Sequence, residues 1–329
     1  PGWVRAWNVR TGEHEWDFHT VPNSADEFGA DTWQNQSWRF SGNANVWSML
    51  AGDNDLGHVY LPTGTTTNDY YGADRPGDNL FSESIIAVDV ETGQRVWHFQ
   101  AVHHGLWDYD FPTHPNLVDI TVDGRNIRAL AQVSKQGFTY VFDRATGDPV
   151  WPLAERPVPQ ETNLPGEVPS LTQPFPTKPP PFEYQGVTID DLVDFTPEIR
   201  ALAVDAVRDF TLGPLFTPPL HADDSGGSAG TIQRPAIDGG ANWGGAGVDP
   251  ETGILYVPSH NRFSVLHFYT PDEAVGGTMQ FTQGAFGGGR QPAMPQGLPL
   301  FKPPYSCLLY TSDAADEGLG VDLGGRRII

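Results

Sequence analysis

The chain has 329 residues, of which 38% are hydrophobic and 12% aromatic, with 37 Gly, 30 Pro and only three Met. Glycine and proline at this density argue against a helical protein, and the aromatic-rich, methionine-poor composition favours β-strands. The formal net charge of −22 argues against a nucleic-acid partner, because neutralising phosphates requires clustered Lys and Arg.

Cysteine usage and apolar runs set further limits. The single cysteine, Cys307, excludes a disulfide, a thiolate metal cluster and covalent haem attachment within the chain. No apolar run reaches the roughly 18 residues that a membrane-spanning helix needs, so we expect no such span. The chain starts at Pro1 inside a repeat pattern, which predicts a fragment of a longer protein without its targeting segment.

Three segments share the pattern Ala/Val-x-Asx-x-x-Thr-Gly-x-x-x-Trp, and they cover residues 6–16, 87–97 and 141–151. Each predicts a strand, a tight turn and a second strand. The Asx side chain caps the turn, and the glycine supplies the positive φ that a short hairpin needs. The tryptophan then falls on a fixed face of the second strand, where it can dock on a neighbouring unit.

A second hairpin pattern, Asp-x-x-x-Gly-x-x-Tyr-x-Pro, covers residues 53–62 and 249–258. One hairpin of each kind makes a four-stranded antiparallel unit, and residues 117–151 supply a compact third unit. Radially repeated units of about 40–50 residues are typical of a β-propeller. The expected fold is therefore all-β, a partial propeller of four-stranded blades. The alternative is a β-sandwich, which does not need the same tryptophan at the same offset.

The hairpin repeats are interrupted at residues 152–236. This segment is rich in proline and contains a short stretch of helical pattern near residues 189–210. We expect an insertion packed over the propeller, with a polyproline ligand as the alternative. Residues 307–329 match no repeat and resemble translated adapter sequence. The native domain is therefore expected to cover residues 1–306, followed by a non-native tail, and a divergent C-terminus is the alternative.

Residues 103–112, His-His-Gly-Leu-Trp-Asp-Tyr-Asp-Phe-Pro, combine two histidines, two carboxylates and aromatic side chains. Asp108 and Asp110 are two positions apart, so they point the same way in extended backbone, and in a turn they can converge on one cation. The alternative is a solvated loop anchored by its tryptophan. His103 and His104 are interpreted as hydrogen-bonding residues that orient the loop, rather than as metal ligands.

The paired hairpins, residues 103–112 and the motif Gly-Ala-Asn-Trp-Gly at 240–244 resemble the quinoprotein dehydrogenases that use pyrroloquinoline quinone (PQQ), most closely the glucose and quinate branch. The resemblance covers about residues 4–306. It implies an eight-bladed propeller, of which this chain would hold somewhat under half and be inactive alone. It further implies a periplasmic enzyme that oxidises a sugar, cyclic polyol or alcohol and passes electrons to a quinone or cytochrome.

The resemblance also implies roles for individual residues. Asp108 corresponds to the catalytic base and a metal ligand, and Asp110 corresponds to an additional metal ligand of some relatives. The loop at 63–68 corresponds to one that supplies a further ligand; we expect Thr67, with Thr65 as the alternative. The metal would be Ca²⁺ or Mg²⁺, which prefer oxygen ligands, and a lanthanide stays open.

The cofactor contacts implied by the resemblance are Lys135 at the quinone oxygens, Trp47 under the quinone plane, and Asn242 and Trp243. Lys135 could instead be a solvated hairpin lysine, and Trp47 could be plain core. The rival function is a non-catalytic propeller that only binds a partner. The enzyme hypothesis requires Asp108, Lys135, Trp47 and Thr67 to face one cavity, whereas a scaffold has no reason to gather them.

Overall fold

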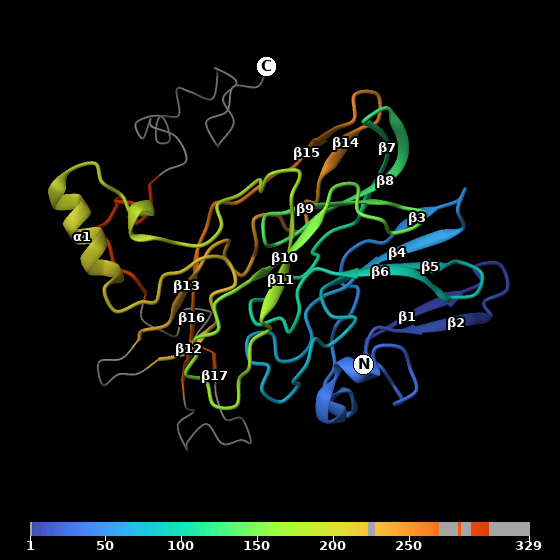
Figure 1. Cartoon of the computed structure of the whole chain (residues 1–329), viewed down its shortest axis with the longest axis horizontal. Coiled ribbons are helices and arrows are strands. Elements are labelled where there is room, and N and C mark those ends of the chain that lie inside the picture. Colours follow the sequence, from blue (N-terminus) through green and yellow to red (C-terminus); the bar gives the residue numbers. More distant parts are fainter. Residues whose placement is uncertain (1, 223–227, 270–281, 284–290, 303–329) are drawn as a thin grey trace.

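The structure is a computed structural model that describes residues 2–222, 228–269, 282–283 and 291–302. Strands dominate this part of the chain, as the composition predicts (Figure 1). The strands form separate sheets of two to four strands, and the sheets do not close into a ring within the described residues. The expected tail, residues 307–329, lies outside the described residues.

One sheet contains four antiparallel strands in the order β3-β4-β5-β6. Their bounds are β3 Ala51–Asp53, β4 His58–Pro62, β5 Ser84–Asp89 and β6 Arg95–Gln100. The hairpin β3–β4 carries the second sequence pattern and the hairpin β5–β6 carries the first. Because β4 also pairs with β5, the predicted four-stranded unit made from one hairpin of each kind is confirmed here.

The remaining repeats form smaller sheets. They are β1 Trp3–Trp7 with β2 His14–His19, β7 Asn116–Val122 with β8 Arg125–Val133 and β9 Thr139–Asp143, and β14 Gly247–Asp249 with β15 Ile254–Tyr256. The third repeat is expected to contain a second strand that runs up to Trp151. The structure has no strand between Asp143, where β9 ends, and Leu153, where β10 begins. Pro149 forms only an isolated bridge with Phe142, because proline has no N–H with which to continue a ladder.

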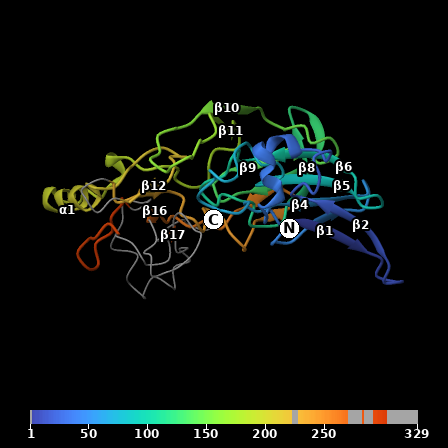
Figure 2. The same ribbon diagram turned by 90° about the horizontal axis from the view of Figure 1, so that it is seen from below.

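Residues 152–236 contain both strands and the α-helix. The elements are β10 Leu153–Pro157, β11 Thr172–Pro176, η3 Ile189–Asp191, α1 Pro197–Val207, β12 Leu220–His221 and β13 Thr231–Gln233. β12 and β13 flank β16 Ser264–Tyr269, which also pairs with β17 Thr282–Gln283. The short 3-10 helices η1 Ala30–Thr32 and η2 Gln34–Arg39 complete the set. In both views α1 lies at one end of the molecule and β1–β2 at the other (Figures 1 and 2).

The helix α1 follows from local sequence signals. Thr196 caps it, since the threonine hydroxyl accepts a hydrogen bond from the backbone N–H of Ile199, and Pro197 occupies the first turn, where no N–H is needed. Its inward residues Ala203 and Val207 pack with Phe210, which follows the helix in the chain. This contact holds α1 against the rest of residues 152–236. In the part of the chain that the structure describes, no helix has the length and apolarity that crossing a bilayer requires.

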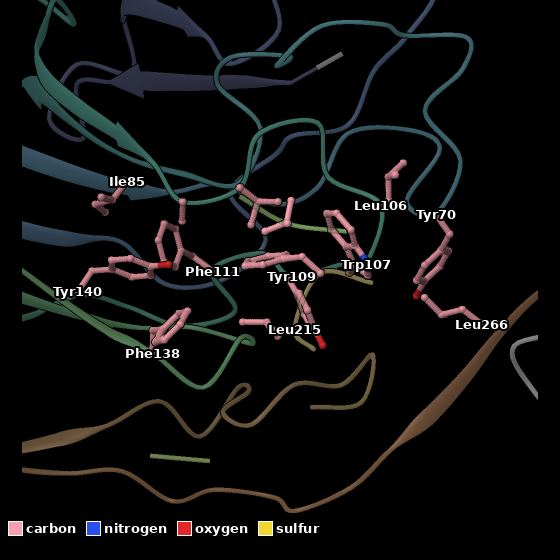
Figure 3. Close-up of a cluster of buried hydrophobic side chains, with 14 of the residues drawn as sticks. Tyr70, Ile85, Leu106, Trp107, Tyr109, Phe111, Phe138, Tyr140, Leu215 and Leu266 are labelled. Atoms are coloured by element: carbon pink, nitrogen blue, oxygen red, sulfur yellow. The ribbon is translucent and has the colours of Figure 1, made fainter. Parts of the chain in front are cut away.

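A large aromatic cluster holds residues 103–112 in place. Trp107, Tyr109 and Phe111 are almost completely buried and point into the same core as Tyr140 and Leu215 (Figure 3). This cluster joins strands of three sheets, those of β4–β6, β8–β9 and β16, to residues 152–236. Because alternate residues of the loop are committed to the core, the intervening Asp108 and Asp110 are left to face the other way.

Repeat tryptophans pack against the turn glycines of the next repeat. A Cβ added to Gly93 would lie 2.5 Å from the ring of Trp16, and one added to Gly147 would lie 2.7 Å from the ring of Trp97. Each indole N–H also donates to a carbonyl of the same turn, Trp16 to Val90 at 2.9 Å and Trp97 to Arg144 at 3.1 Å. Each of these turns therefore needs glycine for its close approach to the ring as well as for its backbone conformation.

This packing can be tested with glycine substitutions. We expect Gly93→Ala and Gly147→Ala to lower the free energy of unfolding by about 2–5 kcal/mol, from the positive φ and the clash with the indole together. Gly12→Ala is the matched control, because Gly12 occupies the same turn position at φ 77° with no atom within 4 Å of the added Cβ. It should cost only about 1–2 kcal/mol. Equal losses in urea denaturation for all three variants would contradict the packing role.

Candidate active site

Four segments far apart in sequence line one cavity of about 300 Å³. Asp108 and Asp110 come from the loop between β6 and β7, and Lys135 comes from the turn between β8 and β9. Trp47 precedes β3. The lining residues are Asn43, Asn45, Trp47, Gly64, Thr65, Asp69, Asp108, Asp110 and Lys135. The structure thus brings together three of the four residues that the enzyme hypothesis requires to share a cavity.

The ammonium group of Lys135 bridges the two carboxylates of the loop. Its Nζ lies 3.0 Å from Asp108 Oδ2 and 2.9 Å from Asp110 Oδ1. The indole N–H of Trp47 donates to Asp110 Oδ2 at 2.7 Å, and Lys135 Nζ lies 5.6 Å from the centroid of the Trp47 ring. Lys135 is buried and Trp47 half-buried, so neither is the solvated lysine or the plain core residue of the alternatives.

The charges in this cavity shift one another's pKa values. Burial raises the pKa of Asp108 to about 7, the charge of Asp110 adds to this, and Lys135 opposes it. Burial by itself would lower the pKa of Lys135, but Asp110 and Asp108 outweigh it and raise that pKa. A carboxylate whose pKa lies near neutrality is suited to accept a proton from a bound hydroxyl group.

The threonine that reaches the cavity is Thr65. Its hydroxyl lies 3.3 Å from Asp108 Oδ1 and 3.3 Å from Glu83 Oε1. Thr67 is exposed, and its backbone carbonyl accepts a hydrogen bond from Ser41 Oγ at 2.8 Å. The three consecutive threonines therefore have different surroundings, and Thr65 takes the position beside Asp108 that was expected of Thr67.

The glycine-rich motif at 240–244 packs against the turn that carries Lys135. The backbone N–H of Gly240 donates to the Lys135 carbonyl at 2.9 Å, and a Cβ on Gly239 would lie 2.5 Å from Lys135 Cγ. The Trp243 ring lies 5.6 Å from the Trp47 ring at 66° and is 61% exposed. Asn242 lines an adjoining cavity of about 570 Å³, whose wall also includes Asp108 and Lys135.

Comparison with known proteins decides the family. The family model described as "PQQ: Glucose/ethanol/alcohol dehydrogenase, beta-propeller domain" matches residues 1–315. The chain belongs to this family. The resemblance to PQQ-dependent dehydrogenases that the motifs predict is therefore confirmed.

Curated relatives of this PQQ dehydrogenase domain include enzymes named for different substrates. The glycerol dehydrogenase large subunit of Gluconobacter oxydans is 35% identical over 256 residues, 77% of this chain and 33% of that protein. The quinoprotein glucose dehydrogenase of Escherichia coli is 34% identical over 76% of this chain and 30% of its own length. The quinate/shikimate dehydrogenase of Acinetobacter baylyi is 30% identical over 78% of this chain and 30% of its own. The chain thus spans about a third of the length of these relatives.

Solved structures support the same fold. The quinohemoprotein alcohol dehydrogenase of Comamonas testosteroni aligns with a TM-score of 0.55 at 23% identity, over 81% of this chain and 34% of that chain. A europium-containing methanol dehydrogenase aligns with the same TM-score at 22% identity, over 81% of this chain and 41% of that chain. At these identities the alignments show a shared β-propeller fold and nothing about the site.

The donors in the cavity suit the groups that PQQ dehydrogenases use. Gly64 leaves the floor open, since a Cβ there would lie 3.1 Å from Trp47 Cδ1 and 3.2 Å from Asp110 Oδ2. Asp108, Asp110 and Thr65 offer only oxygen atoms, the ligands that Ca²⁺ and Mg²⁺ prefer. No three His, Cys, Asp or Glu residues within the described ranges are grouped closely enough to hold a metal by themselves.

Two acidic residues of this site lack a simple sequence signal. Asp69 lines the cavity, and burial followed by the charge of Asp110 raises its pKa. Glu83 is fully buried behind Thr65, and burial raises its pKa to about 8. A Cβ on Gly105 would lie 1.8 Å from Glu83 Oε2, so the loop approaches this carboxyl group closely. An acidic residue placed directly before the apolar strand β5 is the one feature that could have indicated Glu83.

The insertion holds the loop from the other side. The Trp107 indole donates to the Thr217 carbonyl at 2.8 Å, and the Tyr109 hydroxyl donates to the Pro235 carbonyl at 2.7 Å. The Gln233 side chain donates to the Trp107 carbonyl at 2.9 Å. These bonds fix the backbone on both sides of Asp108, which itself has a left-handed φ of 55°.

The two histidines are tied into hydrogen bonds. His104 is buried, with Nδ1 lying 2.8 Å from the Gly77 carbonyl and Nε2 lying 2.7 Å from Glu167 Oε1. The backbone N–H of His103 donates to the Gln173 side chain at 2.8 Å, which donates back to the His103 carbonyl at 2.7 Å. Both histidines thus orient the loop through contacts with the insertion.

The buried Glu83 predicts a pH-dependent stability. Its pKa in the folded protein, about 8, is above the ordinary value of 4.5, so the folded state keeps a proton that the unfolded state releases. The free energy of unfolding should fall as pH rises from about 5 to 8, by up to about 1.4 kcal/mol per pH unit. Glu83→Gln should remove this contribution, so its stability relative to the parent should increase over that range.

Urea denaturation at several pH values measures this difference. Glu91→Gln, at an exposed turn position, is the control and should track the parent at every pH. A constant offset between Glu83→Gln and the parent from pH 5 to 8 would show that Glu83 does not stay protonated in the folded state.

Proposed function

We propose that the full-length protein is a PQQ-dependent dehydrogenase that oxidises a hydroxyl group of a sugar, cyclic polyol or alcohol to a carbonyl. The observation that carries the proposal is that Lys135 forms ion pairs with both Asp108 and Asp110. These groups lie beside Trp47, in a cavity that Thr65 also lines. A propeller that only binds a partner has no need for a partly buried carboxylate with a pKa of about 7 held against a buried ammonium group.

The residues divide the chemistry between them. When bound, PQQ supplies the hydride acceptor, and a divalent cation supplies Lewis-acid polarisation of the quinone. Asp108 accepts the proton of the substrate hydroxyl. Lys135 places positive charge where a quinone oxygen would gain electron density. Trp47 provides a flat apolar surface for a planar ring system, with Trp243 and Asn242 beside it.

The proposed metal ligands are Asp108, Asp110 and a threonine of the loop after β4. The structure favours Thr65 for this role, because Thr67 is exposed and does not line the cavity. We propose Ca²⁺ or Mg²⁺ as the ion, on the basis of the oxygen-only donors.

The wider context of the domain is also part of the proposal. We propose that the complete protein is an eight-bladed propeller whose blades dock through tryptophan, supported by the packing of Trp16 on Gly93 and of Trp97 on Gly147. The protein would work in the periplasm and pass electrons to a quinone or a cytochrome, as the family resemblance implies. The rival function, a binding propeller without cofactor, predicts that the complete protein binds no quinone.

The base assignment is tested by Asp108→Asn in the full-length protein. Asparagine keeps the size of the side chain but cannot accept the proton, so turnover should fall by about 10²–10⁴-fold. Binding of the quinone, followed by its absorbance, should be retained, because Lys135, Trp47 and Asn242 are unchanged. Dye-linked oxidation within tenfold of the parent rate would assign the base to another residue.

A further inference from the structure

The larger cavity beside the site lies where a substrate would meet Asp108. Its volume is about 570 Å³, and Asp108 and Lys135 form the wall that it shares with the smaller cavity under Trp47. The rest of its lining is both polar and apolar, and its charged and amide side chains are Asp238, Asn242, Arg262 and Gln291. This inference rests on the proposed function, because it takes Asp108 as the group that the substrate hydroxyl must reach.

Each cation among the described lining residues of this cavity is already paired with a carboxylate. Arg262 Nη1 lies 2.6 Å from Asp238 Oδ2, and Lys135 Nζ lies within 3.0 Å of both Asp108 and Asp110. Among the described lining residues a substrate carboxylate therefore finds no unpaired cation, and at the Arg262 guanidinium it meets the like charge of Asp238.

The same groups are well arranged for neutral hydroxyls. The Asp238–Arg262 pair places a hydrogen-bond acceptor beside a donor, which matches two adjacent hydroxyl groups on one molecule. The pair is accessible, with the Arg262 side chain 67% and the Asp238 side chain 34% exposed. The amide of Asn242 lies next to it, since its Nδ2 donates to the Asp238 carbonyl at 2.7 Å.

We infer that this cavity selects neutral polyhydroxy substrates and rejects hydroxy acids, with the Asp238–Arg262 pair as the determinant. The relatives include enzymes named for glycerol and glucose, which are neutral, and for quinate and shikimate, which carry a carboxylate. The charge pairing separates these two classes for this chain. Asp238 contributes by neutralising Arg262, the described lining cation that could otherwise hold a substrate carboxylate.

A charge-removing substitution tests the inference by a gain of binding. Asp238→Asn keeps the side-chain size and leaves the Arg262 guanidinium without its carboxylate partner. The KM for quinate should then fall at least tenfold, while the KM for glycerol or glucose rises. In the double variant Asp238→Asn/Arg262→Gln the gain for quinate should disappear, because the freed cation is gone.

The control is a second exposed aspartate–arginine pair remote from the cavity. Asp205 Oδ1 lies 2.8 Å from Arg208 Nη1 near the end of α1. Asp205→Asn changes the net charge of the protein by the same amount, so it should leave KM for both substrate classes within twofold of the parent. A general electrostatic effect would make the two variants behave alike.

The experiment uses the full-length protein loaded with PQQ and Ca²⁺, with dye-linked oxidation of glycerol, glucose, quinate and shikimate as one readout. The second readout is saturation-transfer NMR of the same ligands with the protein before quinone is added. We expect the parent to oxidise and bind the neutral polyols at least a hundredfold better than the acids. Asp238→Asn should acquire binding of quinate in both measurements.

The possible results separate the two hypotheses. If no hydroxyl compound is oxidised but NMR shows polyol binding that Asp238→Asn shifts toward quinate, the proposed function is wrong and the charge selection stands. If the parent oxidises quinate as efficiently as glucose and Asp238→Asn changes neither, the inference is overturned and the proposed function stands. Absence of both oxidation and polyol binding would reject both.

Discussion

The ammonium group of Lys135 between Asp108 and Asp110 is the interaction on which the site depends. Burying an ammonium ion, or the carboxylates that lie 2.9 and 3.0 Å from it, is costly unless each charge is paired. Removing the lysine would leave two like charges facing each other, whereas removing either aspartate would leave a single ion pair with Lys135. The bridge therefore helps to fix the β6–β7 loop against the β8–β9 turn, together with the backbone hydrogen bond from the Lys135 N–H to the Asp110 carbonyl at 3.4 Å.

The bridge is possible because the loop divides its residues between two surfaces. Trp107, Tyr109 and Phe111 are committed to the aromatic core, and this leaves Asp108 and Asp110 on the cavity side. The insertion supplies the hydrogen bonds that hold this division in place. A segment that interrupts the repeats in sequence thus holds residues 103–112 in one conformation, which is the kind of support that a preorganised site requires.

Turn chemistry made the hairpins predictable, and the loops show where sequence reasoning stops. The Asx and glycine positions act locally, so the hairpins at Asp53 and Asp89 form where the patterns place them. Thr65 and Thr67 are chemically identical and two positions apart, and only Thr65 lines the cavity. The sequence pattern does not specify which of the two side chains points into it. Glu83 is a more general case: its protonation depends on complete burial by segments from distant parts of the chain, which a single sequence does not display.

The position of Asp108 and Lys135 in the wall between two cavities has a mechanistic consequence. One face of this wall meets the Trp47 side, which suits a planar cofactor, and the other meets Asp238, Asn242 and the polar residues of the second cavity. Under the proposed function, a substrate in the second cavity can contact Asp108 while the ion pair between Asp108 and Lys135 stays in place. The groups that shift the pKa of Asp108, which include Asp110 and Lys135, differ from the Asp238–Arg262 pair that we propose selects the substrate, so a change in Asp238 should alter selection more than proton transfer.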